Sequence, residues 1–158
     1  MSQTAQEILI NQLLDGAVQV GVHPHPQLFD HLYAVLCCGY STQMDSFEFV
    51  HHGEAFAGVC AVLNEAGTKL RQIEYSAKKS ERQYARAMRK EYSSAGSRIS
   101  NDEVKSAAAD RADADSWEWQ MIQLEAVKNA AWSVRNLLTD RKDFLIEISR
   151  NRRREGGV

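Results

Sequence analysis

The residues whose types and spacing most clearly suggest chemistry form a basic run between positions 78 and 90. Six lysines and arginines recur there at steps of three and four, the repeat that gathers side chains along one strip of an α-helix. Tyrosines are interleaved with them, and Tyr75 precedes them. Cations neutralise phosphates, and flat rings offer unstacked bases a surface on which to stack. The pattern predicts a contact for single-stranded nucleic acid. Its predicted residues are Lys78, Lys79, Arg82, Tyr84, Arg86, Arg89, Lys90 and Tyr92.

The same spacing also fits an ordinary solvent-exposed helix face. Pairs such as Glu74 and Lys78, four residues apart, support a helix without binding anything. A second cluster of cations, Arg150 and residues 152–154, stands near the C-terminus and is compatible with a solvated tail. The residues alone therefore leave nucleic-acid contact and a solvated face open as alternatives.

The histidines and cysteines raise the question of a metal site. They are His23, His25, His31, His51, His52, Cys37, Cys38 and Cys60. None has the Cys-x2-Cys or His-x3-His spacing that brings two ligands from one element to one ion. Adjacent residues such as His51 and His52 point to different sides of a helix. The pattern favours buried cysteines with solvated or capping histidines, and we expect no metal and no cofactor.

No motif for catalysis is present in the sequence. It contains no glycine-rich phosphate loop, no G-x-S-x-G turn and no His-Glu-x-x-His pair. The carboxylates of Asp110, Asp113 and Glu118 fall at helical spacing in an alanine-rich stretch, which is typical of a solvated face. We therefore predict that the protein is not an enzyme.

Charge divides the chain into two parts. Residues 1–68 contain no lysine or arginine and have a net charge of −7, although the whole chain has a formal charge of only −2. Residues 69–158 hold all 19 basic residues and have a net charge of +5. An acidic segment and a basic one usually face different partners.

The composition is that of a soluble globular protein. At 158 residues the chain is long enough for one core. We find no apolar run of the roughly 18 residues that a membrane span needs, and no basic flank of a secretory signal. Three cysteines, an odd number, favour a reducing compartment. We expect no membrane contact and a cytoplasmic location.

Apolar spacing predicts an all-α fold. A first helix is expected over about Thr4–Val20, a break at 21–26 where two prolines occur, and a short helix from Gln27. Residues 39–45 resemble a loop, and residues 47–50 fit either a brief extended piece or the start of the next helix.

Two long helices are predicted after the head. The first runs from about Gly53 to Tyr92, with apolar residues at alternating steps of four and three between Val59 and Ala77. A serine-rich turn follows, and Ser100 with Glu103 forms a capping-box pattern. The last helix is expected over about Asn101–Asn151, before Gly156-Gly157 ends it.

The short turn predicts that these helices fold back as a long antiparallel, coiled-coil-like hairpin. We predict a small acidic head over residues 1–52 and the hairpin over residues 53–158. A hairpin of this kind rarely buries both apolar stripes alone, so we expect a homo-oligomer. The predicted interface residues are Trp117, Met121, Leu124, Trp132, Leu138 and Leu145. For the tryptophans, the apolar neighbours favour core or interface packing over base stacking.

Three segments together carry a family resemblance. They are the basic helix Lys78–Tyr92, the segment ISNDEVKSAAADRAD at Ile99–Asp113, and VRNLLTDRKDFLIEISRNRRRE at Val134–Glu155. In order and pattern, residues 70–155 resemble the UvsY-type recombination mediators of tailed phages. The resemblance implies a helical homo-oligomer that binds single-stranded DNA and helps load a RecA-like recombinase onto strands covered by single-strand binding protein. It implies that the basic run faces DNA and that the last helix drives oligomerisation.

The functional expectation is a non-enzymatic, oligomeric single-stranded DNA-binding mediator of recombination or replication. Its partners would be DNA, copies of itself, and a recombinase or single-strand binding protein in a bacterial host cell. The alternative is a protein-interaction module, such as a coiled-coil scaffold, virion component or host inhibitor, that docks a partner through the acidic head. The head lies outside the resemblance.

Overall fold

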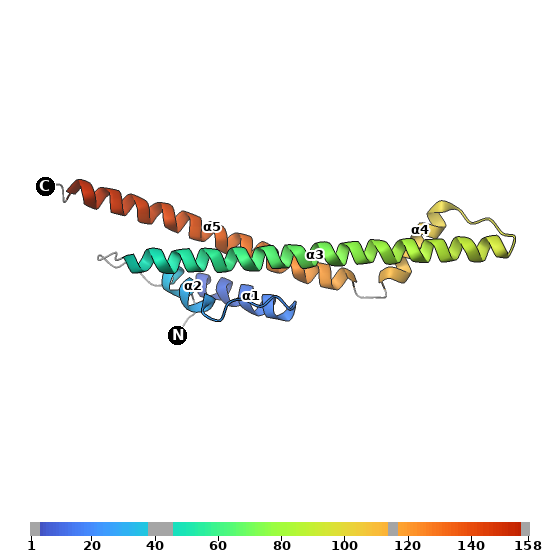
Figure 1. Cartoon of the computed structure of the whole chain (residues 1–158), viewed down its shortest axis with the longest axis horizontal. Coiled ribbons are helices and arrows are strands. Elements are labelled where there is room, and N and C mark those ends of the chain that lie inside the picture. The colour runs from blue at the N-terminus through green and yellow to red at the C-terminus, as the bar shows by residue number, and fades with distance from the viewer. Residues whose placement is uncertain (1–3, 38–45, 114–116, 156–158) are drawn as a thin grey trace. The chain divides into compact units, whose positions relative to one another are not determined.

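A computed structural model describes residues 4–37, 46–113 and 117–155. These residues form five helices and no strand, so the all-α prediction is confirmed for the described part of the chain (Figure 1). The helices are α1 (Ala5–Gln19), α2 (Leu28–Leu36), α3 (Ser46–Ser94), α4 (Asn101–Asp113) and α5 (Trp117–Glu155).

The helices belong to two compact units. Unit 1 comprises Met1–Ala66 and Ala126–Val158, and unit 2 comprises Gly67–Glu125. α3 and α5 each contribute one part to each unit. The predicted division between residues 52 and 53 falls inside α3. The acidic N-terminal segment is therefore packed in one unit with the C-terminal part of α5.

The ends of α1 follow from local hydrogen bonding. The Thr4 hydroxyl accepts a hydrogen bond from the Glu7 backbone N–H at 3.2 Å, which satisfies one of the unpaired amides of the first turn. At the other end, Gly21 adopts φ of 70°, a conformation that suits glycine, and Val22 N–H donates to the Ala17 carbonyl at 2.8 Å. The predicted helix and its break are both present.

The core of unit 1 consists of aliphatic side chains from four helices. α1 supplies Ile10, Leu13 and Ala17, while α2 supplies Leu28, Leu32 and Val35. α3 supplies Ala55, Val59, Val62 and Ala66, and α5 supplies Val127, Ala131, Val134, Leu138 and Leu145. The absence of a side chain at Gly58 lets α2 approach α3 closely, because a Cβ at Gly58 would lie 2.5 Å from Leu28 Cδ1.

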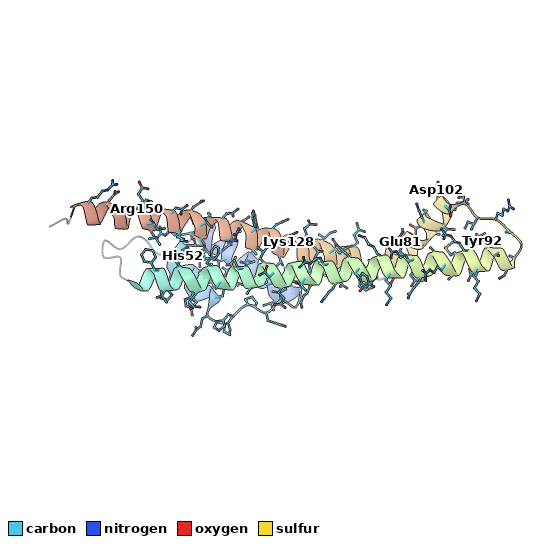
Figure 2. The ribbon with its side chains drawn as sticks, turned by 45° about the horizontal axis from the view of Figure 1, so that its top comes forward. His52, Glu81, Tyr92, Asp102, Lys128 and Arg150 are labelled. Carbon is cyan, nitrogen blue, oxygen red and sulfur yellow. The ribbon has the colours of Figure 1, made fainter. Side chains whose placement is uncertain are left out.

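Two contacts fix the direction of α3 against α5 in unit 1. His52 Nε2 lies 2.6 Å from the Leu138 carbonyl oxygen, and the Arg135 guanidinium lies 5.5 Å from the centre of the Phe56 ring. Residue numbers rise along α3 while they fall along α5, so these two segments are antiparallel. Figure 2 labels His52 on this part of α3.

α3 begins earlier than predicted. The helix starts at Ser46, so the stretch 47–50 is the first part of α3 and not an extended piece. The predicted apolar repeat does face inward, since Val59, Ala66 and Leu70 are buried, and Ile73 is half-buried. The predicted loop at 39–45 lies outside the described residues.

The turn after α3 has the predicted chemistry. Gly96 takes φ of 71°, and Ser97 N–H donates to the Tyr92 carbonyl at 3.0 Å. The capping box is complete: Ser100 N–H donates to Glu103 Oε2 at 3.0 Å, and Glu103 N–H donates to Ser100 Oγ at 3.1 Å. The predicted last helix corresponds to α4 and α5, and residues 114–116 and 156–158 lie outside the described residues.

Candidate nucleic-acid interface

All six cations of the basic run are exposed on the part of α3 that belongs to unit 2. At about 100° of rotation per residue, they fall within an arc of about 120° around the helix. Arg71 is also exposed and falls in the same arc. Seven cations therefore share one face over about 28 Å of helix. We call this face the basic arc: Arg71, Tyr75, Lys78, Lys79, Arg82, Arg86, Arg89 and Lys90.

The carboxylates of this stretch of α3 lie outside the basic arc. Glu74 lies about 40° beyond its edge, while Glu81 and Glu91 lie about 60° and 100° beyond its two edges. Glu81 is half-buried, and Figure 2 labels it on α3. Between Arg71 and Lys90, the face of α3 that carries the cations thus holds no acid. A solvated helix stabilised by its own ion pairs more often mixes the two signs.

The three tyrosines of this region differ in their placement. Tyr75 is 69% exposed and lies near the centre of the basic arc, although it was not among the predicted binding residues. Tyr84 is half-buried and lies on the side of α3 that carries the buried Leu70 and Met88. Tyr92 is 40% exposed and lies just beyond the arc, near the end of α3 (Figure 2). Tyr75 is therefore the ring best placed to stack on a base.

Projection of the sequence onto a helical wheel identifies Arg71 and Tyr75. The predicted set began at Lys78 because the run of consecutive cations starts there. Rotation about the helix axis, and not proximity along the chain, decides which side chains share a face. Arg71 lies seven residues before Lys78, almost two full turns, and so stands on the same side of the helix.

Arg89 also takes part in the packing of unit 2. Its Nη2 donates to Asn101 Oδ1 at 3.0 Å, which links α3 to the first residue of α4. A guanidinium has five N–H donors in all, so this bond does not exhaust its capacity. Arg89 is thus both a structural and a candidate phosphate-binding residue, whereas Arg82 and Arg86 are simply exposed.

The predicted oligomer-interface residues divide into two groups. Leu124, Leu138 and Leu145 are at most 2% exposed, so they are already buried within the single chain. Trp117 and Met121 are half-buried, and Trp132 is 52% exposed, with the Arg135 guanidinium 5.0 Å from its ring centre. Other apolar side chains of α5 that the prediction omitted are also exposed. These are Trp119, Ile122, Leu137 and Phe144.

The histidines are more involved in packing than predicted. The Nδ1 atoms of His31 on α2 and His51 on α3 lie 2.8 Å apart, so one ring donates to the other. His52 is 7% exposed, and its Nε2–H donates to the Leu138 carbonyl. His25 Nδ1 accepts from the Gln27 backbone N–H at 3.3 Å, as a capping histidine would. His51 and His52 do point to different helices.

A pocket of about 200 Å³ lies between α2 and α3, lined in part by His25, His31 and Glu54. Within the described ranges, no group of three or more histidine, cysteine, aspartate or glutamate side chains is arranged to hold a metal ion. Cys37 and Cys60 are half-buried, and Cys38 lies outside the described residues.

None of the described helices contains a stretch that is both long and apolar enough to cross a membrane. No family model, no curated protein and no solved structure matches the chain. The residues of this chain and their geometry are therefore what indicates its function.

Proposed function

We propose that the protein is a non-enzymatic, oligomeric single-stranded DNA-binding protein that acts as a mediator of recombination or replication. The observation that supports this most is the basic arc, in which seven exposed cations share one face of α3 without an acid among them. Fixed charge of one sign along an exposed face attracts a polyanion and raises its association rate.

Phosphate contacts would supply most of the affinity. The basic arc extends over about 28 Å, long enough for several consecutive phosphates of an extended strand. Tyr75, near its centre, would stack on one unpaired base. Stacking and phosphate contact do not depend on base identity, so binding should show little sequence preference.

The proposal includes an antiparallel hairpin of α3 and α5 and a homo-oligomer. The His52–Leu138 and Phe56–Arg135 contacts support the antiparallel direction within unit 1. Several copies would present several basic arcs to one strand, which multiplies affinity without new contacts. The acidic N-terminal segment would then be left to dock a RecA-like recombinase or a single-strand binding protein.

A second candidate function is a protein-interaction module that works through the acidic segment. Five large hydrophobic side chains of that segment are exposed: Ile8 is 43% exposed, Val18 59%, Tyr33 41%, Phe49 42% and Val50 59%. Exposed apolar side chains rimmed by polar ones mark protein-binding surfaces where they form a patch. In this case the cations of α3 would be a solvated face.

Light scattering after size exclusion, with and without a poly-dT strand, tests the proposal. The proposal predicts a species larger than one chain, and a shift in mass and absorbance ratio when the strand is added at low salt. Fluorescence anisotropy of a labelled oligonucleotide gives the affinity in the same buffer. Absence of binding at about 50 mM salt, where phosphate contacts are strongest, would contradict the proposal and favour the interaction module.

A further inference from the structure

The C-terminal part of α5 carries two acidic residues followed by two basic residues, at spacings that are symmetric about the midpoint of the set. Asp143, Glu147, Arg150 and Arg154 follow one another at steps of four, three and four residues, with two negative charges before two positive ones. All four side chains are exposed. We call this set the charged strip. With Ile146 and Asn151 it lines an open groove of about 450 Å³ along α5.

The charged strip faces away from the core of unit 1. Leu138 and Leu145, which are buried in that core, lie about 140° to 160° around the helix from Asp143. Figure 2 labels Arg150 on this part of α5. The exposure of all four charges means that the described part of the same chain does not cover the strip.

Within one helix, the pattern is partly unfavourable. Asp143 and Glu147 stand four residues apart with like charge, and so do Arg150 and Arg154. Like charges at this spacing destabilise a helix, because the side chains are neighbours on its surface. A partner that brings cations to the first pair and anions to the second would offset both repulsions.

A second copy of the same segment, in antiparallel orientation, brings cations to the acidic pair and anions to the basic pair. An antiparallel copy whose two-fold axis passes between residues 148 and 149 sets Asp143 opposite Arg154 and Glu147 opposite Arg150. The same two pairs recur on the other side of the axis, so four oppositely charged pairs form. A parallel copy in register would instead set Asp143 beside Asp143 and Arg150 beside Arg150. A parallel copy shifted by seven residues would form only two oppositely charged pairs, Asp143 with Arg150 and Glu147 with Arg154. The charges therefore favour the antiparallel arrangement, which forms four.

We propose that the charged strip is a docking surface for a second copy of this chain, which pairs with it in an antiparallel, two-fold symmetric manner. A two-fold interface uses the same patch on both copies, and such a patch must be self-complementary. Ile146, half-buried at the edge of the strip, adds apolar area to the contact. The inference rests on the homo-oligomer of the proposed function, which it specifies, but not on nucleic-acid binding, since the basic arc lies on α3.

Because exposed ion pairs are screened, the association should be sensitive to salt. The Debye length falls from about 10 Å at 0.1 M to about 3 Å at 1 M salt. Exposed pairs are also individually weak, so association should appear at high protein concentration and low ionic strength. This behaviour separates the charged strip from an apolar interface, which salt does not weaken.

Charge inversion of one half of the strip is the sharpest test. The variant Asp143→Arg/Glu147→Arg makes the strip wholly positive, and Arg150→Glu/Arg154→Glu makes it wholly negative. Each variant alone should lose self-association by at least about tenfold at about 50 mM salt, because every pair now repels. Mixed in equal amounts, the two should associate again, because each strip meets its opposite. Sedimentation velocity reads out both effects.

Two controls keep the test clear. Lys105→Glu/Lys142→Glu changes the net charge as much as the negative variant does but lies off the strip, and it should self-associate like the natural chain. The fourfold inversion Asp143→Arg/Glu147→Arg/Arg150→Glu/Arg154→Glu restores complementarity and should restore the dimer. Circular dichroism verifies that every variant keeps its helices.

Three results would overturn the inference. The first is a natural chain that is monomeric at every concentration at low salt, and the second is an oligomer that neither single-sign variant weakens. The third is a mixture of the two variants that associates no more than each does alone.

Discussion

Replacement of Lys78, Arg82 and Arg86 by alanine would remove three cations from the middle of the basic arc. All three are exposed, and alanine is the residue that best supports a helix, so α3 should stay helical. Arg89 is kept because it donates to Asn101 and thus helps to join α3 to α4. Any change in DNA binding would then report lost phosphate contacts and not lost structure.

The size of the effect follows from counterion release. For single strands, the slope of log affinity against log salt is about −0.7 for each phosphate contact. Seven cations allow a slope as steep as about −5, and loss of three contacts should make it shallower by about 2. Each phosphate contact raises the logarithm of the association constant by about 0.7 at 0.1 M salt. Loss of three contacts should therefore lower the affinity there by about 100-fold.

Fluorescence anisotropy of a labelled dT oligonucleotide, titrated at several salt concentrations, measures both quantities. The matched control is Lys105→Ala/Lys128→Ala/Lys142→Ala, which removes three cations from α4 and α5 and leaves the basic arc intact. The control should keep its slope and lose little affinity. Equal losses of affinity in the two triple variants would contradict this prediction, because net charge and not the basic arc would then govern binding.

Four further predictions concern single residues. Tyr75→Ala should weaken single-stranded DNA binding by about 1–3 kcal/mol, while Tyr75→Phe keeps the ring and the affinity, as anisotropy would show. Gly67→Ala should raise the free energy of unfolding in urea by about 1 kcal/mol, because a Cβ there meets no described atom within 4 Å. Gly58→Ala should raise it less or lower it, because a Cβ there would lie 2.5 Å from Leu28 Cδ1 and overpacking offsets the gain in helix propensity, and equal effects at the two glycines would refute the close approach of α2 and α3. The Ser100 backbone N–H, and next its side chain, lower the pKa of Glu103, so the contribution of that carboxylate to folding is present at neutral pH. This contribution is lost as the pH falls from about 4.3, the ordinary pKa of a glutamate, through the lowered pKa of Glu103. In Glu103→Gln, the helicity measured by circular dichroism should therefore change less with pH in that window.

Local signals in the sequence predicted most of the helix boundaries. Thr4 before an apolar repeat marks the start of α1, and Ser100 with Glu103 marks the start of α4, because both depend on hydrogen bonds within four residues. The sequence leaves residues 47–50 open between an extended piece and the start of α3, because Phe49 and Val50 have strong strand propensity. They are helical and exposed, so intrinsic propensity did not decide their conformation.

What packs against each face could not be predicted from the sequence. Leu138 and Leu145 follow the repeat that a subunit interface would show, yet both are already buried within the single chain. An apolar stripe indicates that something covers it, but not whether the cover comes from the same chain. For the same reason His52 was expected to be solvated or capping, although the carbonyl it meets on α5 lies 86 residues away.

Helical spacing alone predicts which cations of the candidate site share one face of α3. The exposure of Arg82 and Arg86 on one face follows from their separation in sequence, so these residues stay candidates. The position of Tyr84 required knowledge of which face of α3 is covered, and it proves to be half-buried. The angular position of each residue around the helix axis identifies Tyr75, and not Tyr84, as the tyrosine on the basic face.

Photocrosslinking of the whole protein to a strand that contains iododeoxyuridine tests the central claim most directly, because this base reacts with an aromatic ring on which it stacks. Mass spectrometry of the digested complex then identifies the linked peptide. The proposal predicts a crosslink to the peptide that contains Tyr75 and its loss in Tyr75→Ala. Crosslinks confined to Trp119 or Trp132 on α5, with none on α3, would contradict it.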